Sequence, residues 1–297
     1  MSVGNLRVGG AGKTPIVEHL ARLLIARGER PAILTRGYGR RTAAAGVTVV
    51  SDGRRVLADV HAAGDEPLML ARALPGVIVA VGADRFLSGC LAERRLGATV
   101  HILDDGFQHF ALARDVDLIV TGEDDLHDQP IPAGRLREPL AAARSAHAAI
   151  VDAGYLPAAE RVGRALGVAQ VFRATRLLGP PRMVRSGDTV VVPEQSRVFA
   201  TAGIARPERF FNDLSAADWQ VVGMMPFRDH HQFTKHDVAR IGAAAKSSSA
   251  AIILTTDKDA VRFAACDLAE LPIAAVPLTA TVEPADEFCA WLLSRLQ

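Results

Sequence analysis

The sequence predicts an α/β fold, with a mostly parallel sheet covered by helices on both faces and a second, smaller α/β domain. Short apolar runs typical of buried strands alternate with helical patterns along most of the chain. A glycine-rich loop opens the first helix, and between residues 172 and 196 the pattern changes to Pro-Pro, Ser-Gly and short β-type segments. We therefore expect a first domain over 1–171, a short β linker over 172–196 and a C-terminal α/β domain over 197–297 that closes a cleft.

The composition excludes several classes of protein. The formal net charge of +1 over 297 residues argues against broad electrostatic binding to nucleic acid. Cys90, Cys266 and Cys289 are scattered and form no C-x-x-C pair, which fits a reducing cytosol and gives neither a disulfide framework nor a zinc site. No stretch approaches the ~20 apolar residues that cross a bilayer. We expect a cytosolic protein without an obligate protein partner.

The stretch from Gly9 to Thr14 predicts a phosphate-binding loop. Its glycines let backbone N–H groups turn toward phosphate oxygens, Lys13 would reach the β- and γ-phosphates of ATP, and the Thr14 hydroxyl would hold Mg²⁺. The match to G-x-x-x-x-G-K-[ST] is incomplete, because Arg7 stands where the first glycine belongs, and the alternative is a glycine-rich turn without a ligand. The residues expected to bind the nucleotide are Arg7, Val8, Gly9, Gly10, Ala11, Gly12, Lys13 and Thr14.

This loop makes the first domain a P-loop kinase-type unit. Its first helix has Pro15 in the opening turn, an apolar face that includes Ile16, Leu20 and Leu24, and Gly28 at its end. Further apolar runs predict strands at 31–35, 77–81, 99–103, 117–121 and 148–151, helices at 68–74 and 85–96, and a β-hairpin of 47–51 with 55–58.

Two pairs of carboxylates follow predicted strands or open predicted helices. Asp65 can cap the helix that follows it, or it can act with Glu66 as base and metal ligand, and the spacing alone does not choose. Asp104 and Asp105 end a buried strand, a usual source of an Mg²⁺ contact beside a P-loop, although a turn or helix cap is the alternative. Further along, Arg137 can clamp a phosphate or pair with a surface carboxylate.

The C-terminal domain repeats the strand and helix alternation, with strands expected at 198–202, 221–224, 251–255 and 273–277. Thr234 and Asp237 predict a helix capping box. Just before them, Asp229, His230 and His231 lie in a predicted loop, where they can form an acid–base relay, a metal site or a polar turn.

Taken together, these stretches resemble tetraacyldisaccharide 4′-kinase, the lipid A kinase of Gram-negative bacteria. The resemblance spans nearly the whole chain and is carried by Val3 to Leu6, Gly9 to Pro15, Leu34 to Tyr38, Gly64 to Pro67, Ile102 to His109, Leu136 to Pro139, Asp229 to His231 and Thr255 to Ala260. It implies that MgATP and tetraacyldisaccharide 1-phosphate meet between the domains, where the γ-phosphate passes to the 4′-hydroxyl to form lipid IVA.

The resemblance also implies roles for single residues. Asp65 would accept the hydroxyl proton with help from His230, while Lys13 would neutralise charge. Thr14, Glu66, Asp104 and Asp105 would surround Mg²⁺. The residues expected to contact substrate or phosphate are Asn5, Arg85, His109 and Arg137.

In the family, an apolar helix for membrane contact and the strand that feeds the P-loop come first, whereas only Met1 to Val3 precede Gly4 here. Either the beginning of the family's chain is missing from this sequence or the sheet lacks part of that strand. We expect a peripheral position on the cytoplasmic face of the inner membrane, weakened if the apolar helix is absent. Two other readings remain. A regulatory or metal-delivery P-loop NTPase is disfavoured because there is no Asn-Lys-x-Asp motif, and a soluble small-molecule kinase would need no apolar surface for acyl chains.

Overall fold

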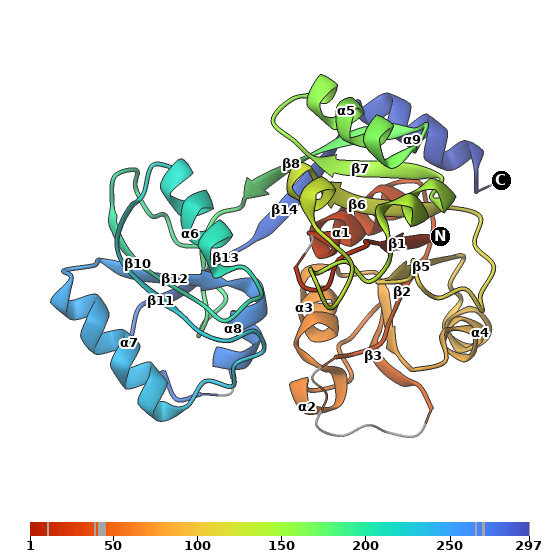
Figure 1. Ribbon diagram of the computed structural model, residues 1–297. Helices are drawn as coiled ribbons and strands as arrows, with labels where there is room; N and C mark the ends of the chain where they lie inside the picture. Colours follow the sequence, from red (N-terminus) through yellow and green to blue (C-terminus); the bar gives the residue numbers. More distant parts are fainter. Residues whose placement is uncertain (11, 39, 41–45, 265, 269–270, 297) are drawn as a thin grey trace.

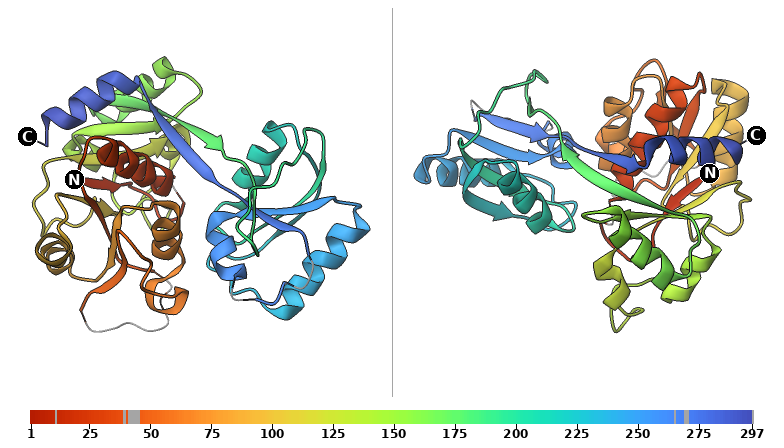
Figure 2. Two further views of the ribbon diagram at one scale, coloured as in Figure 1. Left: turned by 180° about the vertical axis from the view of Figure 1, so that it is seen from behind. Right: turned by 90° about the horizontal axis from the view of Figure 1, so that it is seen from above.

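The computed structural model describes residues 1–10, 12–38, 40, 46–264, 266–268 and 271–296. The chain forms two lobes, and two long strands, β8 (Val171–Leu178) and β14 (Leu278–Glu283), run between them (Figures 1 and 2). The first lobe is built on a nine-stranded sheet and the second lobe on a five-stranded sheet. The fold class expected from the sequence is confirmed.

The sheet of the first lobe has the order β14-β8-β7-β6-β1-β5-β2-β4-β3, parallel throughout except for β14 and β3 at its two edges. The short strand β1 lies at its centre, fully buried and paired with both β5 and β6. Because the P-loop follows β1, it emerges at the carboxyl edge of the sheet, beside the end of β5. The remaining strands are β1 (Ser2–Gly4), β2 (Pro31–Thr35), β3 (Thr48–Asp52), β4 (Ile78–Val81), β5 (Val100–Asp104), β6 (Asp117–Gly122) and β7 (Ala148–Asp152).

Helices cover both faces of this sheet because its buried strands are apolar on both sides. On β2, Ile33 packs into the core under α1, α3 and α9, whereas Ala32 and Leu34 face the core under α4. A third hydrophobic core lies under α5, on the same face of the sheet as the core under α4. The helices are α1 (Lys13–Ala26), α2 (Val60–Ala63), α3 (Asp65–Ala73), α4 (Arg85–Leu96), α5 (Leu156–Leu166) and α9 (Ala285–Ser294), with 3-10 turns at Glu123–His127 and Leu140–Ser145.

The sheet of the second lobe has the order β11-β10-β12-β13-β9, with only β9 antiparallel. Helix α6 packs on one face, and α7 and α8 pack on the other. The capping box expected at Thr234 and Asp237 is present at the start of α7. The elements are β9 (Arg182–Met183), β10 (Arg197–Ala202), β11 (Gln220–Pro226), β12 (Ile252–Thr256), β13 (Ile273–Val276), α6 (Pro207–Ala216), α7 (Lys235–Ser247) and α8 (Asp257–Phe263).

Three features differ from the sequence-based expectations. Residues 55–58 do not form the second strand of the expected hairpin, and only Val56 makes an isolated bridge to β3. The strand partner of β3 is β4 instead. Residues 278–296 return to the first lobe rather than staying in a domain that starts at 197, since β14 pairs with β8 and Phe288 packs against Phe172. Asp65 does not cap α3, whose N-cap is Gly64.

Candidate active site

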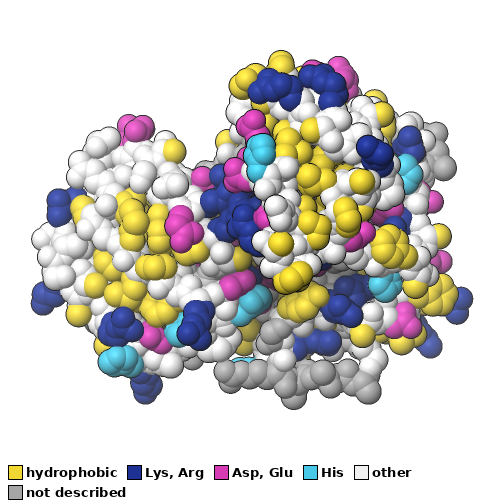
Figure 3. Space-filling view, in the orientation of Figure 1, with side chains coloured by type: hydrophobic (Ala, Val, Ile, Leu, Met, Phe, Trp, Pro, Cys, Tyr) yellow, Lys and Arg dark blue, Asp and Glu magenta, His cyan; other side chains and the backbone are white. Residues whose placement is uncertain are grey.

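A cavity of about 680 Å³ lies between the two lobes. The first lobe lines it with the P-loop, the ends of β2 and β5, and the start of α3, and the second lobe with the loop after β10 and the start of α8. Basic side chains gather where the lobes meet (Figure 3), and the lining arginines there include Arg176, Arg206 and Arg209. The Arg209 guanidinium lies 3.4 Å from the Asp152 carboxylate of the first lobe, so an ion pair links the two lobes beside the cavity.

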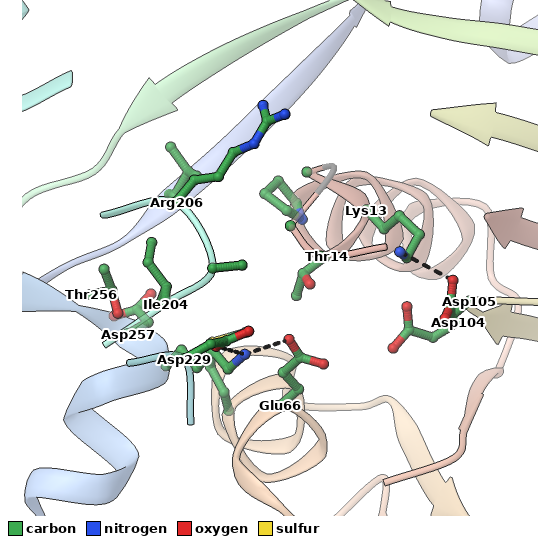
Figure 4. A pocket seen from close by; sticks show the side chains of 18 of the residues that line it. Lys13, Thr14, Glu66, Asp104, Asp105, Ile204, Arg206, Asp229, Thr256 and Asp257 are labelled. Atoms are coloured by element: carbon green, nitrogen blue, oxygen red, sulfur yellow. Dashed lines mark hydrogen bonds and ion pairs between the residues drawn. The ribbon is translucent and has the colours of Figure 1, made fainter. Parts of the chain in front are cut away.

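The P-loop has the backbone that its glycines predict. Gly9 and Gly12 have φ angles of 88° and 78°, in the region that favours glycine, and Gly12 is the N-cap of α1. No side chain caps α1, so its free N–H groups face the cavity. The Lys13 ammonium donates to Asn5 Oδ1 at 2.7 Å and lies 3.1 Å from Asp105 Oδ1 (Figure 4). These two residues hold Lys13 at the mouth of the loop.

The two aspartates at the end of β5 have different surroundings. Asp105 pairs with Lys13 and with Arg137, whose guanidinium lies 3.0 Å from its carboxylate. Burial opposes ionisation of Asp105, but the two cations outweigh it and lower its pKa. Burial raises the pKa of Asp104 to about 6, and the nearby charge of Glu66 adds to the effect. The negative charge of Asp105 is thus balanced by two ion pairs, whereas no described residue forms an ion pair with Asp104.

The chemistry around Asp104 fits a divalent cation. The Thr14 hydroxyl and the carboxylates of Glu66 and Asp104 point into the same part of the cavity (Figure 4). Mg²⁺ is usually held by one or two carboxylates together with substrate phosphates. In agreement, the described part of the chain contains no group of three His, Cys, Asp or Glu side chains that could hold an ion alone. Thr14, Glu66 and Asp104 leave room for phosphate oxygens and water as further ligands of such a cation.

Asp65 and His230 come from different lobes and pair beside the cavity, which His230 lines while Asp65 is buried. Asp65 Oδ2 lies 3.0 Å from His230 Nδ1, and Asp65 Oδ1 accepts a hydrogen bond of 3.0 Å from the Glu66 N–H. Burial alone would raise the pKa of Asp65, but the His230 hydrogen bond and the charges of Lys258 and Arg262 lower it. The hydrogen bond to Asp65 raises the pKa of His230. His230 has a φ of 59°, so the backbone is held in a strained conformation that aims the ring at Asp65.

A sequence model described as "Tetraacyldisaccharide-1-P 4'-kinase" matches residues 1–297. The chain belongs to this kinase family. A tetraacyldisaccharide 4′-kinase from Desulfotalea psychrophila is 40% identical over 274 residues, which are 88% of this chain and 77% of the relative. One from Nitrobacter hamburgensis is 40% identical over 288 residues, 96% of this chain and 82% of the relative.

A solved structure of the same kinase family has the same architecture. LpxK from Aquifex aeolicus in complex with ATP aligns with a TM-score of 0.76 and 29% identity, covering 100% of this chain and 88% of that chain. The family and the class of ATP-dependent lipid kinase expected from the sequence are confirmed. None of the described helices is long and apolar enough to span a membrane.

Several residues expected at the site of this kinase family member do not line the cavity. The Arg7 side chain is buried against Asp125, with a nitrogen–oxygen distance of 2.6 Å, and so it points away from the P-loop. Arg85 is buried, and donates to the Gly82 carbonyl at 2.7 Å. His109 is half-buried outside the cavity lining, and Asn5 and Asp65 are buried and do not line it either. Ala11 lies outside the described residues. Val8, Gly9, Gly10, Gly12, Lys13, Thr14, Glu66, Asp104, Asp105, Arg137 and His230 line the cavity.

Sequence reasoning missed Lys258 and Arg262 as members of the site, and it gave Asp229 only as a candidate of the loop that carries His230. Lys258 lies 3.0 Å from Glu66 and 3.2 Å from Asp229, and the fully buried Arg262 lies 3.4 Å from Asp65. The sequence pattern that could have indicated them is a helix that directly follows a strand and has Lys258 and Arg262 four residues apart, on one face.

Proposed function

We propose that this chain transfers the γ-phosphate of ATP to the 4′-hydroxyl of tetraacyldisaccharide 1-phosphate, which forms lipid IVA. The observation that carries the proposal is that the P-loop of the first lobe and His230 of the second lobe line one cavity, and that His230 is paired there with the buried Asp65 of the first lobe. Phosphoryl transfer needs positioned reactants, neutralised phosphate charge and an acceptor for the hydroxyl proton. The family match names the lipid acceptor.

Asp65 is the residue that takes the proton. Its Oδ2 is engaged by His230, but its Oδ1 accepts only the Glu66 N–H and keeps a lone pair for the 4′-hydroxyl. His230 is less suited to be the base, since its second ring nitrogen, Nε2, lies 3.4 Å from the Lys258 ammonium. His230 therefore orients Asp65, and the hydrogen bond between them raises the pKa of His230 and lowers that of Asp65.

The phosphates lie at the start of α1. The free N–H groups of α1 and the Lys13 ammonium stabilise negative charge on the β- and γ-phosphates. When bound, Mg²⁺ adds positive charge that polarises the phosphate oxygens. Thr14, Glu66 and Asp104 would hold it, whereas Asp105 anchors Lys13 and Arg137. Of the four Mg²⁺ ligands that the family resemblance implies, this assignment keeps three and leaves out Asp105.

The decisive experiment follows transfer of ³²P from γ-labelled ATP to detergent-dispersed tetraacyldisaccharide 1-phosphate. We expect a labelled bisphosphorylated lipid, loss of it on adding EDTA, and about a 10²- to 10³-fold lower rate in Lys13→Ala, because a preorganised cation at the phosphates is removed. Lys246→Ala, an exposed lysine of α7, serves as a control with unchanged activity. ATP hydrolysis without lipid labelling would overturn the proposal and favour a P-loop switch.

We propose further that the chain works as a peripheral protein on the cytoplasmic face of the inner membrane. Phe86 and Phe110 are 65% and 69% exposed, and they follow β4 and β5, the two neighbours of β2. Because β4 and β5 are both parallel to β2, the segments that carry the two rings leave the sheet at the same, carboxyl edge. Exposed aromatic side chains of this kind suit a lipid interface.

Flotation with vesicles of phosphatidylethanolamine and phosphatidylglycerol tests this position. We expect the wild-type chain to float with the vesicles and the Phe86→Ser/Phe110→Ser variant to float at least severalfold less. Val191→Ser, which alters an 86% exposed side chain of the second lobe, should float like the wild type. Equal flotation of all three proteins would exclude this surface as the membrane contact.

A further inference from the structure

Lys258 lies at the start of α8, and its side chain is only 14% exposed. Lysine is rarely buried to this degree unless it is paired. Here the ammonium group lies 3.0 Å from Glu66 Oε1, 3.2 Å from Asp229 Oδ1 and 3.4 Å from His230 Nε2. An ammonium group has three N–H donors, so each donor has one partner.

The position of Lys258 on its helix is unfavourable for the helix itself. It is the second residue of α8, where the N-terminal end of the helix dipole disfavours a positive charge. The cap of α8 does not need Lys258, because the Thr256 side chain accepts the Asp259 N–H. Its placement therefore serves contacts outside α8, and all three of those contacts lie at the active site.

The contact with His230 determines which ring nitrogen carries the proton. An ammonium group has no lone pair, so in the neutral ring Nε2 must be the acceptor and the proton resides on Nδ1. Nδ1 faces Asp65 Oδ2 at 3.0 Å and can donate to it. The opposite tautomer would place an N–H against the ammonium group and a lone pair against the carboxylate, and both contacts would be repulsive.

We propose that Lys258 is a positioning residue of the phosphoryl transfer: it keeps the His230 proton on Nδ1, facing Asp65, and ties Glu66 of the first lobe to the loop of Asp229 and His230. The inference rests on the proposed roles of Asp65 and Glu66. Lys258 does not contact the expected position of the hydroxyl group; it acts through His230 and Glu66. A single side chain thus joins the residue that orients the base to a residue of the cation site.

The first test compares Lys258→Met, which keeps the length of the side chain but not its charge or donors, with Lys258→Arg. We expect kcat to fall about 10- to 100-fold in Lys258→Met, with the KM for ATP within about twofold of wild type, since the P-loop is untouched. Arginine has only donors and should recover part of kcat. Lys235→Met, at the exposed start of α7, is the matched control. A kcat in Lys258→Met equal to wild type would overturn the proposal.

The second test reads the tautomer directly and does not depend on kinase activity. In ¹⁵N-histidine-labelled protein, the His230 signals are assigned by their loss in His230→Gln, at a pH above the titration of the ring. We expect a protonated Nδ1 and a bare Nε2 in the wild type, and a mixture of tautomers in Lys258→Met. A wild-type ring protonated on Nε2 would refute the role of Lys258. Absence of lipid labelling by the wild type would instead refute the proposed function.

Discussion

Replacing Asp65 with Asn is expected to lower kcat by about 10²- to 10⁴-fold, the usual contribution of a positioned general base. Asparagine has the same shape, and its amide oxygen can still accept the Glu66 N–H that Asp65 Oδ1 accepts at 3.0 Å. The amide cannot take up a proton, and its NH2 group replaces the oxygen that faces His230 Nδ1, so proton acceptance and the contact with His230 are lost while the shape of the side chain is kept. ATP binding should be unchanged, because the P-loop contacts do not involve Asp65.

Steady-state kinetics and calorimetric titration with ATP separate these two effects. Asp59→Asn is a suitable control, since Asp59 caps α2 in the same lobe by accepting the His61 and Ala62 N–H groups, and asparagine caps equally well. Near-normal activity of Asp65→Asn would remove Asp65 as the base. Loss of ATP binding together with activity would show instead that Asp65 supports the nucleotide site.

The sequence predicted the parts of the site that depend on local pattern. A glycine-rich loop before a helix and a buried strand that ends in aspartate are both short signals, and parallel strands bring their carboxyl ends to one edge. Thr14, Asp104 and Lys13 therefore lie where the pattern placed them. The proposed proton acceptor was harder to assign, because Asp65 followed by Pro67 is also typical of a capping residue.

Contacts between distant segments were not predictable in this way. Arg7 reads as a P-loop residue, but it is paired with Asp125, 118 residues away, and its direction depends on that partner. Lys258 gains its role only when the second lobe meets α3. The return of β14 to the first lobe was missed for a related reason, since an apolar run does not reveal which sheet it joins.

Arg262→Met is expected to lower the free energy of unfolding by about 3–5 kcal/mol, the cost of removing one partner from a buried ion pair. Arg262 and Asp259 are fully buried, and their nitrogen and oxygen atoms lie 2.9 Å apart. The guanidinium also donates to the carbonyls of Gly203 and His231, each at 3.0 Å. Methionine fills much of the volume but leaves these two carbonyls without this donor, and it removes the cation from Asp259, whose carboxylate keeps the hydrogen bonds from the Gly203 N–H and the Thr256 hydroxyl. Since domains are stable by only about 5–15 kcal/mol, the loss is large.

Urea denaturation measures this effect without screening the ion pair, as guanidinium salts would. Arg240→Met removes an exposed arginine 3.8 Å from Asp237 and should change stability by less than about 1 kcal/mol. Removing both charges in Arg262→Met/Asp259→Leu should recover part of the stability, because no buried carboxylate then remains unpaired. The double variant should still have a lower kcat, since Arg262 Nε lies 3.4 Å from Asp65 Oδ2 and helps to fix the base. A single variant as stable as wild type would mean that Asp259 is neutralised or hydrated when Arg262 is absent, and that the pair contributes no net stability.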